Sequence, residues 1–305
     1  MTELLREEYQ VEKVPVVIRN SLLKSWRLYL VNEGKLLFQG LKSAFADPII
    51  LLARTVWPKS RDKAIRPQAR WFDIKPKNPN GIAILLCHGF GATPEVFKEL
   101  APVIANEGYY VRAIRISGHG TSPGHLATTS GADWLASVAW HYKETAKEYE
   151  QIYYLGHSLG GTLGLLLATI FPIQRIVVMC TPIKLNIPPA KYVRQASIIV
   201  KYWPRSKRRR NEIKELGTAH YNVSPLYAIA GIFEVGKVLI SRKHLLTTPV
   251  LYISAKYDAR SLRDQPEAFR KNLDQTPVEF KTAGNSRHTI LEGPDLPQVT
   301  KWILD

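Results

Sequence analysis

Short apolar runs alternate with longer amphipathic segments over two stretches of this 305-residue chain. The runs are rich in β-branched and aromatic residues and are typical of buried parallel strands. They cover Ile82–Cys87, Tyr110–Ile116, Ile152–Leu155, Ile176–Cys180, Val250–Ser254 and Val278–Phe280. Segments with helical periodicity fall between or after them, over Pro94–Asn106, Ala132–Tyr149, Ser158–Phe171, Asp264–Leu273 and Pro294–Leu304. This order predicts an α/β protein with a doubly wound, mostly parallel sheet and right-handed crossovers.

Two segments lie outside this alternation. Residues 183–247 stand between two predicted strands, are helix-like and contain several prolines, so we expect a small helical cap there. Residues 1–71 precede the first long strand and are predicted to form an N-terminal helical extension, and Trp71–Ile74 is a candidate edge strand where it meets the core. The core is thus expected in two parts, residues 72–182 and 248–305.

The composition narrows the class of protein. Its 45% hydrophobic and 10% aromatic residues can form a sizeable core and exclude wholesale disorder. The two cysteines, Cys87 and Cys180, exclude a disulfide scaffold and fit a reducing compartment, and no Cys/His pattern indicates a zinc site. No apolar run reaches the roughly 18 residues of a membrane span. The acidic N-terminus lacks the features of a signal peptide, so we expect a cytoplasmic protein.

The net charge of +16 lies outside the predicted core. Residues 1–13 carry a net charge of −2, residues 14–71 one of +8 and residues 183–247 one of +10, whereas residues 72–182 and 248–305 are neutral. A charge of this size indicates an anionic partner, such as a nucleic acid, an anionic membrane or an acidic ligand. The charge therefore belongs to the pieces added around the core.

The sequence Gly156-His157-Ser158-Leu159-Gly160 has the G-x-S-x-G pattern of a nucleophile elbow. It stands between a predicted strand and an apolar helix, which is the context that this pattern requires. Such a turn points the serine hydroxyl out of the sheet, and side chains in place of the two glycines would clash with it. The helix that follows directs N–H groups and the positive end of its dipole at a reacting carbonyl oxygen. A chance glycine-rich turn is the alternative.

The partners of a nucleophilic serine follow in the chain. A serine hydroxyl needs a base, and the base needs a carboxylate that orients it. Asp258 and His288 each come just after one of the last two predicted strands, and chemistry in open α/β sheets gathers at the carboxyl ends of the strands. We therefore predict Ser158, Asp258 and His288 as the catalytic residues. Asp264 is the main rival for the acid, although it lies deeper in the next predicted helix.

Seven further histidines compete with His288 for the role of the base. His88, His119 and His157 lie in glycine-rich turns, and we interpret them as hydrogen-bonding residues that shape loops. No strand end immediately precedes the other four, which we expect on the surface or in the cap: His125, His141, His220 and His244.

The oxyanion hole requires two N–H donors. Leu159, the residue after the nucleophile, is predicted to supply one, and Phe90 in the loop His88-Gly89-Phe90-Gly91-Ala92 the other. The alternative is that this loop is only a glycine-rich turn. Cys87 beside it could be a thiol nucleophile, but it ends an apolar run and is better interpreted as a small buried residue.

From about residue 80 to its end, the chain resembles the bacterial carboxylesterases and monoacylglycerol lipases of the α/β-hydrolase fold. The matching stretches are residues 88–92, 118–123, 156–161 and 178–182, with the late Asp258 and His288. The resemblance implies hydrolysis of carboxylic esters by a Ser-His-Asp triad, no metal or organic cofactor, and a small cap in place of residues 183–247. Residues 1–71 have no counterpart in it, and the loops around Asp258 and His288 depart from its usual pattern.

We therefore predict a serine hydrolase that cleaves carboxylic esters of hydrophobic or lipid-like small molecules, since the cap segment is rich in apolar residues. An acyltransferase or a thioesterase with the same triad is an open alternative, because the shape of the pocket and the access of water determine which molecule accepts the acyl group. A non-catalytic basic binding module on a hydrolase fold is a more distant one.

The basic segments give a hypothesis for location. Residues 21–45 have apolar positions near helical spacing interleaved with Lys and Arg, a pattern common in helices at membrane interfaces. With Arg205–Arg210 they would hold the enzyme peripherally on an anionic membrane; the alternative is that residues 14–71 pack on the core. Nucleic acid is not favoured as a partner, because Arg205–Arg210 lacks interleaved aromatics and any nucleic-acid fold motif.

Overall fold

The structure is a computed structural model that describes residues 64–183, 193, 195–197, 200–216, 218–258, 265–273 and 275–305. The predicted N-terminal extension lies outside these residues up to position 63, as does much of the first half of the predicted cap. The hypothesis of an amphipathic helix over residues 21–45 therefore stays a prediction.

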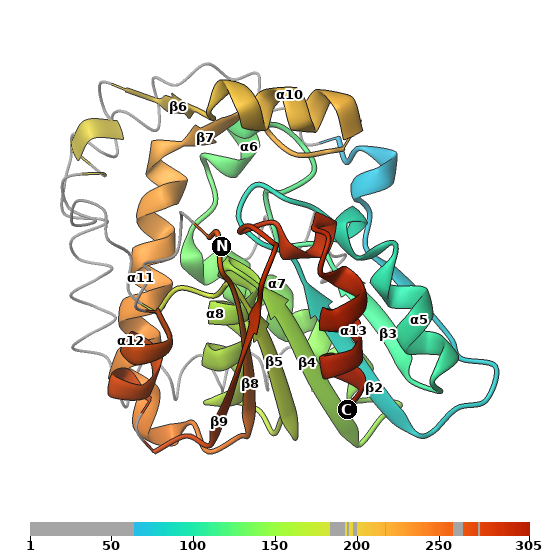
Figure 1. The fold of residues 1–305 in the computed structure, drawn as a ribbon. Coiled ribbons are helices and arrows are strands. Elements are labelled where there is room, and N and C mark those ends of the chain that lie inside the picture. The colour runs from blue at the N-terminus through green and yellow to red at the C-terminus, as the bar shows by residue number, and fades with distance from the viewer. Residues whose placement is uncertain are drawn as a thin grey trace. The chain divides into compact units, whose positions relative to one another are not determined.

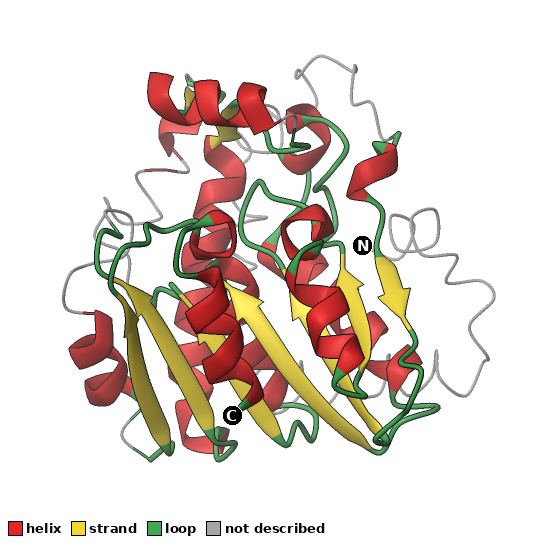
Figure 2. Ribbon diagram, turned by 45° about the vertical axis from the view of Figure 1, so that its right-hand side comes forward, coloured by secondary structure: helices red, strands yellow, loops and turns green. Residues whose placement is uncertain are grey.

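A seven-stranded sheet forms the centre of the described region, in the order β1-β3-β2-β4-β5-β8-β9 (Figures 1 and 2). Its strands are β1 (Phe72–Ile74), β2 (Ile82–Cys87), β3 (Tyr110–Ile114), β4 (Gln151–His157), β5 (Arg175–Met179), β8 (Val250–Ala255) and β9 (Val278–Ala283). All neighbours are parallel except β1 and β3. The six predicted strands and the edge strand are confirmed.

Helices cover both faces of this sheet (Figure 1). The two faces bury separate apolar clusters, because alternate residues of a strand point to opposite sides: Leu85 of β2 belongs to one cluster and Leu86 to the other. The first cluster includes residues of α7 (Gly131–Thr145), α8 (Leu159–Ala168), α11 (Leu226–Arg242) and α12 (Gln265–Asn272), and the second includes residues of α5 (Leu100–Asn106) and α13 (Leu296–Leu304). The predicted α/β class with a doubly wound, mostly parallel sheet is confirmed.

The helix predicted over Pro94–Asn106 is interrupted. Residues Pro94–Phe97 form a 3₁₀ turn, and α5 begins only at Leu100. Helix α7, predicted over Ala132–Tyr149, begins one residue earlier, where Ser130 and Asp133 cap its first turn reciprocally, and it ends at Thr145.

The segment predicted as a helical cap contains more than helices. Helix α10 (Lys207–Leu216) is accompanied by a short antiparallel pair, β6 (Tyr202–Pro204) and β7 (Val223–Pro225), which the periodicity did not indicate. These elements lie above the carboxyl ends of the sheet strands (Figures 1 and 2). Helix α11 descends from them and packs on α7, where Gly131 and Gly231 allow the two backbones to approach closely. The short helix α6 (Pro123–Leu126) lies near β7. In the part of the chain that the structure describes, no helix has the length and apolarity to cross a membrane.

Candidate active site

Ser158 occupies a strained turn between β4 and α8, with φ 52° and ψ −118°. A positive φ is unfavourable for a residue with a side chain and marks a position that the surrounding structure imposes. The glycines on either side make the turn possible. A Cβ on Gly156 would lie 2.5 Å from the backbone of Gly161, and one on Gly160 would lie 2.2 Å from the carbonyl oxygen of Cys87. The predicted strand–turn–helix elbow is therefore present.

The structure brings Ser158, His288 and Asp258 into one hydrogen-bonded chain. His288 Nε2 lies 3.0 Å from Ser158 Oγ, and His288 Nδ1 lies 2.9 Å from Asp258 Oδ2. A carboxylate only accepts, so Nδ1 carries the proton of the neutral ring and Nε2 is left to accept from the serine. The side chains of Asp258 and His288 are 6% and 12% exposed, so the pair is largely shielded from water. Its arrangement is that of a nucleophile, a base and an orienting carboxylate. Asp264, the rival acid, lies outside the described residues.

The two residues predicted to supply oxyanion donors also lie beside Ser158. Leu159 is the first residue of α8 and is buried, and the N–H groups of a first helical turn have no intrahelical acceptor. The loop that carries Phe90 approaches from β2, where a Cβ on Gly89 would lie 3.1 Å from the Cβ of Ser158. Phe90 is fixed by edge contacts with His119 and Trp134, at ring-centroid distances of 5.7 and 5.9 Å.

Two of the histidines interpreted as loop-shaping residues do hold loops. His88 Nδ1 donates to the carbonyl oxygen of Gly89, and His88 Nε2 accepts from the N–H of Ile116. His119 Nδ1 donates to the carbonyl oxygen of Ser117. Burial lowers the pKa of His88 well below its usual value and that of His119 to about 3, with nearby positive groups acting in the same direction. Both rings are therefore neutral at physiological pH.

The prediction that His125 and His141 lie on the surface is wrong. Both are buried, and His141 packs edge-on against Trp71 and Trp140. His125 shares a hydrogen bond with the hydroxyl of Thr121. Sequence periodicity placed His141 on a helix but could not show that the buried face of α7 includes it.

Cys180 is a residue of the site that the sequence analysis missed. It follows β5 with a positive φ of 48°, and its Sγ lies within 4.8 Å of a carboxylate oxygen of Asp258 and a ring nitrogen of His288. Burial raises the pKa of its thiol well above the usual value, and the charge of Asp258 and a hydrogen bond to it raise it further. The thiol is thus protonated and donates to the carboxylate. Cys87, in contrast, is a buried residue whose thiol pKa burial raises to about 12, as expected for a packing role.

The cap contacts both loops of this site. Arg205 donates from Nη2 to the carbonyl oxygen of Phe90 at 3.3 Å, and Gly91, with φ 69°, leaves the space that this guanidinium occupies. On the other side, the buried Arg209 of α10 forms a 3.2 Å ion pair with the partly exposed Glu292, four residues after His288. The cap is therefore linked to the loop of Phe90 and to the segment that carries the base.

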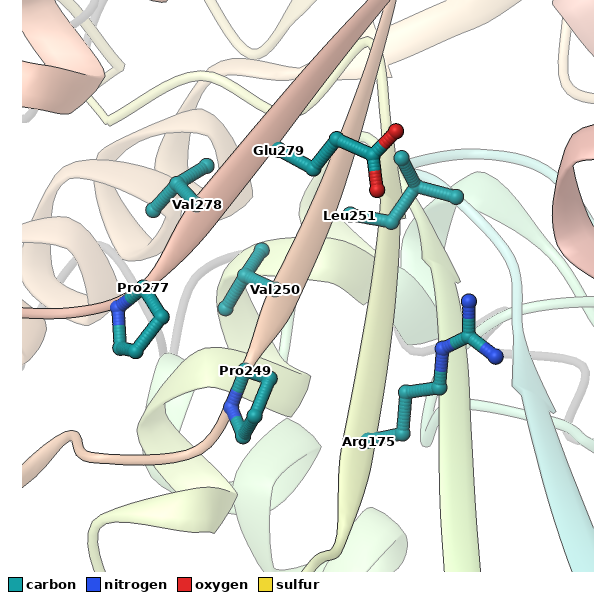
Figure 3. Close-up of a pocket in the computed structure, with 7 residues that line it drawn as sticks. All are labelled: Arg175, Pro249, Val250, Leu251, Pro277, Val278 and Glu279. Atoms are coloured by element: carbon teal, nitrogen blue, oxygen red, sulfur yellow. The ribbon is translucent and has the colours of Figure 1, made fainter. Parts of the chain in front are cut away.

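An open pocket of about 480 Å³ lies at the opposite end of the sheet (Figure 3). It is formed where β5, β8 and β9 begin, and its lining residues are Arg175, Pro249, Val250, Leu251, Pro277, Val278 and Glu279. Ser158, Asp258 and His288 lie at the carboxyl ends of their strands, so this pocket is not part of the site.

Comparisons with known proteins agree with this fold. Residues 78–295 match the model of a protein family described as serine aminopeptidase, S33 (Hydrolase_4). The chain belongs to this family. The match confirms the prediction that the protein is an enzyme.

Two curated relatives are an esterase and a lipase. The carboxylesterase of Bacillus subtilis (strain 168) is 24% identical over 209 residues, which are 68% of this chain and 85% of that protein. The thermostable monoacylglycerol lipase of Bacillus sp. (strain H-257) is 40% identical over 91 residues, which are 30% of this chain and 36% of that protein. Among solved structures, one chain from a study of the metagenome-derived lipolytic enzymes LipS and LipT shares the fold with a TM-score of 0.69 at 21% identity, over 79% of this chain and 98% of that chain. Together with the family match, these relatives confirm the predicted resemblance to lipases and esterases of the α/β-hydrolase fold.

Proposed function

We propose that this protein hydrolyses carboxylic esters with Ser158 as nucleophile, His288 as general base and acid, and Asp258 as the orienting carboxylate. The observation that carries the proposal is the hydrogen-bonded chain from Ser158 Oγ through both nitrogens of His288 to Asp258 Oδ2, at 3.0 and 2.9 Å. These distances lie within the range that direct proton transfer requires.

In the proposed reaction, Ser158 Oγ attacks the ester carbonyl carbon while His288 Nε2 takes the hydroxyl proton. The carbonyl oxygen becomes negative, and the N–H groups of Phe90 and Leu159 stabilise it. His288 then gives its proton to the leaving alcohol, and the acyl-enzyme forms. Water, deprotonated by His288, attacks the acyl group, and the proton returns to Ser158 as the acid leaves. Asp258 stays ionised and stabilises the imidazolium that forms in both halves.

The substrates that fit best are hydrophobic or lipid-like esters. The related proteins named above are a carboxylesterase and a monoacylglycerol lipase, which supports this class. The family description also names an aminopeptidase, whose substrate would bring an ammonium group close to the scissile bond. The positively charged guanidinium of Arg205, which the cap places on the loop of Phe90, would repel this ammonium group. The geometry therefore favours an ester. An acyltransferase or a thioesterase with the same triad remains the alternative.

We also propose that the cap holds the enzyme on an anionic membrane surface. Its β6 strand exposes 38% of Tyr202 and 62% of Trp203, and Arg208 and Arg210 of the neighbouring α10 are exposed as well. Exposed aromatics beside arginines suit the interface of an anionic bilayer, where each basic residue contributes about 1 kcal/mol. Vesicle flotation with phosphatidylserine should show binding that weakens in high salt and in Trp203→Ser. Absence of binding at low salt would contradict the proposal.

Labelling with a fluorophosphonate probe tests the reaction. Wild-type protein should be labelled, and Ser158→Ala should be neither labelled nor active. The matched control is Ser241→Ala, because this exposed serine of α11 only bonds to its own helix. Hydrolysis of acyl esters, monoacylglycerols, acyl-CoA and aminoacyl amides by the wild type then separates the alternatives. Unchanged ester hydrolysis in Ser158→Ala would refute the assignment, and a protein that is never labelled would instead favour a binding module.

A further inference from the structure

His157 lies next to the nucleophile and contacts the base. It is the last residue of β4 and is 8% exposed. Its Nε2 lies 2.7 Å from the carbonyl oxygen of His288, and the two rings are 5.1 Å apart. A carbonyl oxygen only accepts, so His157 Nε2 carries a proton and donates it to this bond.

The base needs such an anchor because it lies in a loop. Residues 284–289 connect β9 to the short 3₁₀ turn Ile290–Glu292, and they do not take part in the sheet. The main chain before His288 is held by the bond from the Tyr257 N–H to the carbonyl oxygen of Ser286, at 3.1 Å. At position 288 itself, the carbonyl is held by His157, which is joined covalently to Ser158.

The ring of His157 is itself fixed. A Cβ on Gly89 would lie 3.0 Å from its Nδ1, so the ring packs against the loop that carries Phe90. It therefore lies between that loop and the backbone of the base. A shift of the His288 carbonyl would turn the backbone from which the catalytic imidazole extends, and a misplacement of about 1 Å can lower a rate about 100-fold.

We propose that His157 is a positioning residue that fixes the backbone of His288 relative to Ser158, and thereby the geometry of proton transfer. This inference rests on the proposed function, in which His288 is the base. His157 touches no reacting atom. It acts through the hydrogen bond to the carbonyl of residue 288.

Two substitutions separate the hydrogen bond from the packing. His157→Phe keeps the ring volume and removes the donor, whereas His157→Gln retains an amide N–H near the position of Nε2. We expect kcat for an activated ester to fall about 10- to 100-fold in His157→Phe with KM nearly unchanged. His157→Gln should recover most of the loss. If the phenylalanine variant does not fold, His157→Met provides the same comparison, since methionine also fills space without donating.

A spectroscopic readout and a control complete the test. The proton between His288 Nδ1 and Asp258 should give a downfield ¹H NMR signal that broadens or moves in His157→Phe and returns in His157→Gln. His141→Phe is the matched control, because it replaces a buried histidine that packs on Trp71 and Trp140, and its kcat should stay at the wild-type value.

Two results would overturn the inference. One is a folded His157→Phe whose kcat lies within threefold of the wild type, and the other is a folded His157→Gln that is as impaired as the phenylalanine variant. Neither result would contradict the proposed function. That function is refuted only if Ser158→Ala keeps its ester hydrolysis or the wild type shows none.

Discussion

Replacing Gly160 by alanine should damage catalysis more than stability. The new Cβ would lie 2.2 Å from the carbonyl oxygen of Cys87 and 2.6 Å from that of His88, both main-chain atoms at the end of β2. Real Cβ contacts essentially never fall below 3.0 Å, so α8 and the end of β2 must separate by about 0.8 Å. Each of these segments positions one of the two proposed oxyanion donors, because Leu159 begins α8 and Phe90 follows the end of β2.

This separation gives the expected magnitude. Oxyanion donors act at about 2.7–3.1 Å, and an extra 0.8 Å takes one of them beyond hydrogen-bonding range. The loss of one donor costs about 10²–10³ in kcat, or roughly 3–4 kcal/mol, while KM should change little. Overpacking should also lower the free energy of unfolding by about 1–3 kcal/mol, which corresponds to about 2–5 °C in Tm for a chain of this length.

The assay measures kcat and KM with an activated ester at 15 °C, together with thermal unfolding by circular dichroism. Gly236→Ala is the matched control, because its nearest neighbour, the carbonyl oxygen of Ile183, would lie 3.7 Å from the new Cβ. That variant should keep its kcat and gain about 0.5–1 kcal/mol as a helical alanine. A kcat of Gly160→Ala within fivefold of the wild type would refute the reasoning.

Three further predictions concern the acid, the cap and the pH. Asp258→Asn should lower kcat about 10⁴-fold, because an amide no longer enforces the required His288 tautomer; steady-state kinetics with more than 1% of wild-type kcat would contradict it. Arg209→Met removes a partly buried ion pair with Glu292 and should reduce the free energy of unfolding by about 1 kcal/mol in urea titrations. An unchanged midpoint would show the ion pair to be dispensable. The pKa of His119 is about 3 in the folded chain and about 6.5 in the unfolded chain, so only the unfolded chain binds this proton between those values. The free energy of unfolding should fall by up to about 1.4 kcal/mol per pH unit from this group as the pH drops below about 6.5, and urea titrations at pH 7.5 and 5.5 that agree would contradict this.

The core was predictable because its information is local. Each strand from Ile82–Cys87 onward is a short apolar run between polar turns, and the elbow is a contiguous pattern. Gly156 is required by its close approach to Gly161, a few residues away, whereas Gly160 is required by a tertiary contact with the carbonyl oxygen of Cys87. The pair β6–β7 was missed because each strand has only three residues, too few to show a period. The interruption before Leu100 was missed because a 3₁₀ turn and an α-helix share nearly the same spacing of apolar residues.

The candidate site also has features that the sequence predicts and features that only the structure shows. The sequence by itself determined which residues could be nucleophile, acid and base, because their order along the chain follows from the strands that precede them. Only the tertiary structure decided that His157 donates to the carbonyl of His288, that Cys180 donates to Asp258 and that Arg205 reaches the loop of Phe90. These contacts join segments that are separated by up to 131 positions. The order of the strands in the sheet decides which of their carboxyl ends lie next to one another, and so which segments meet. The periodicity of a single segment therefore cannot predict these contacts.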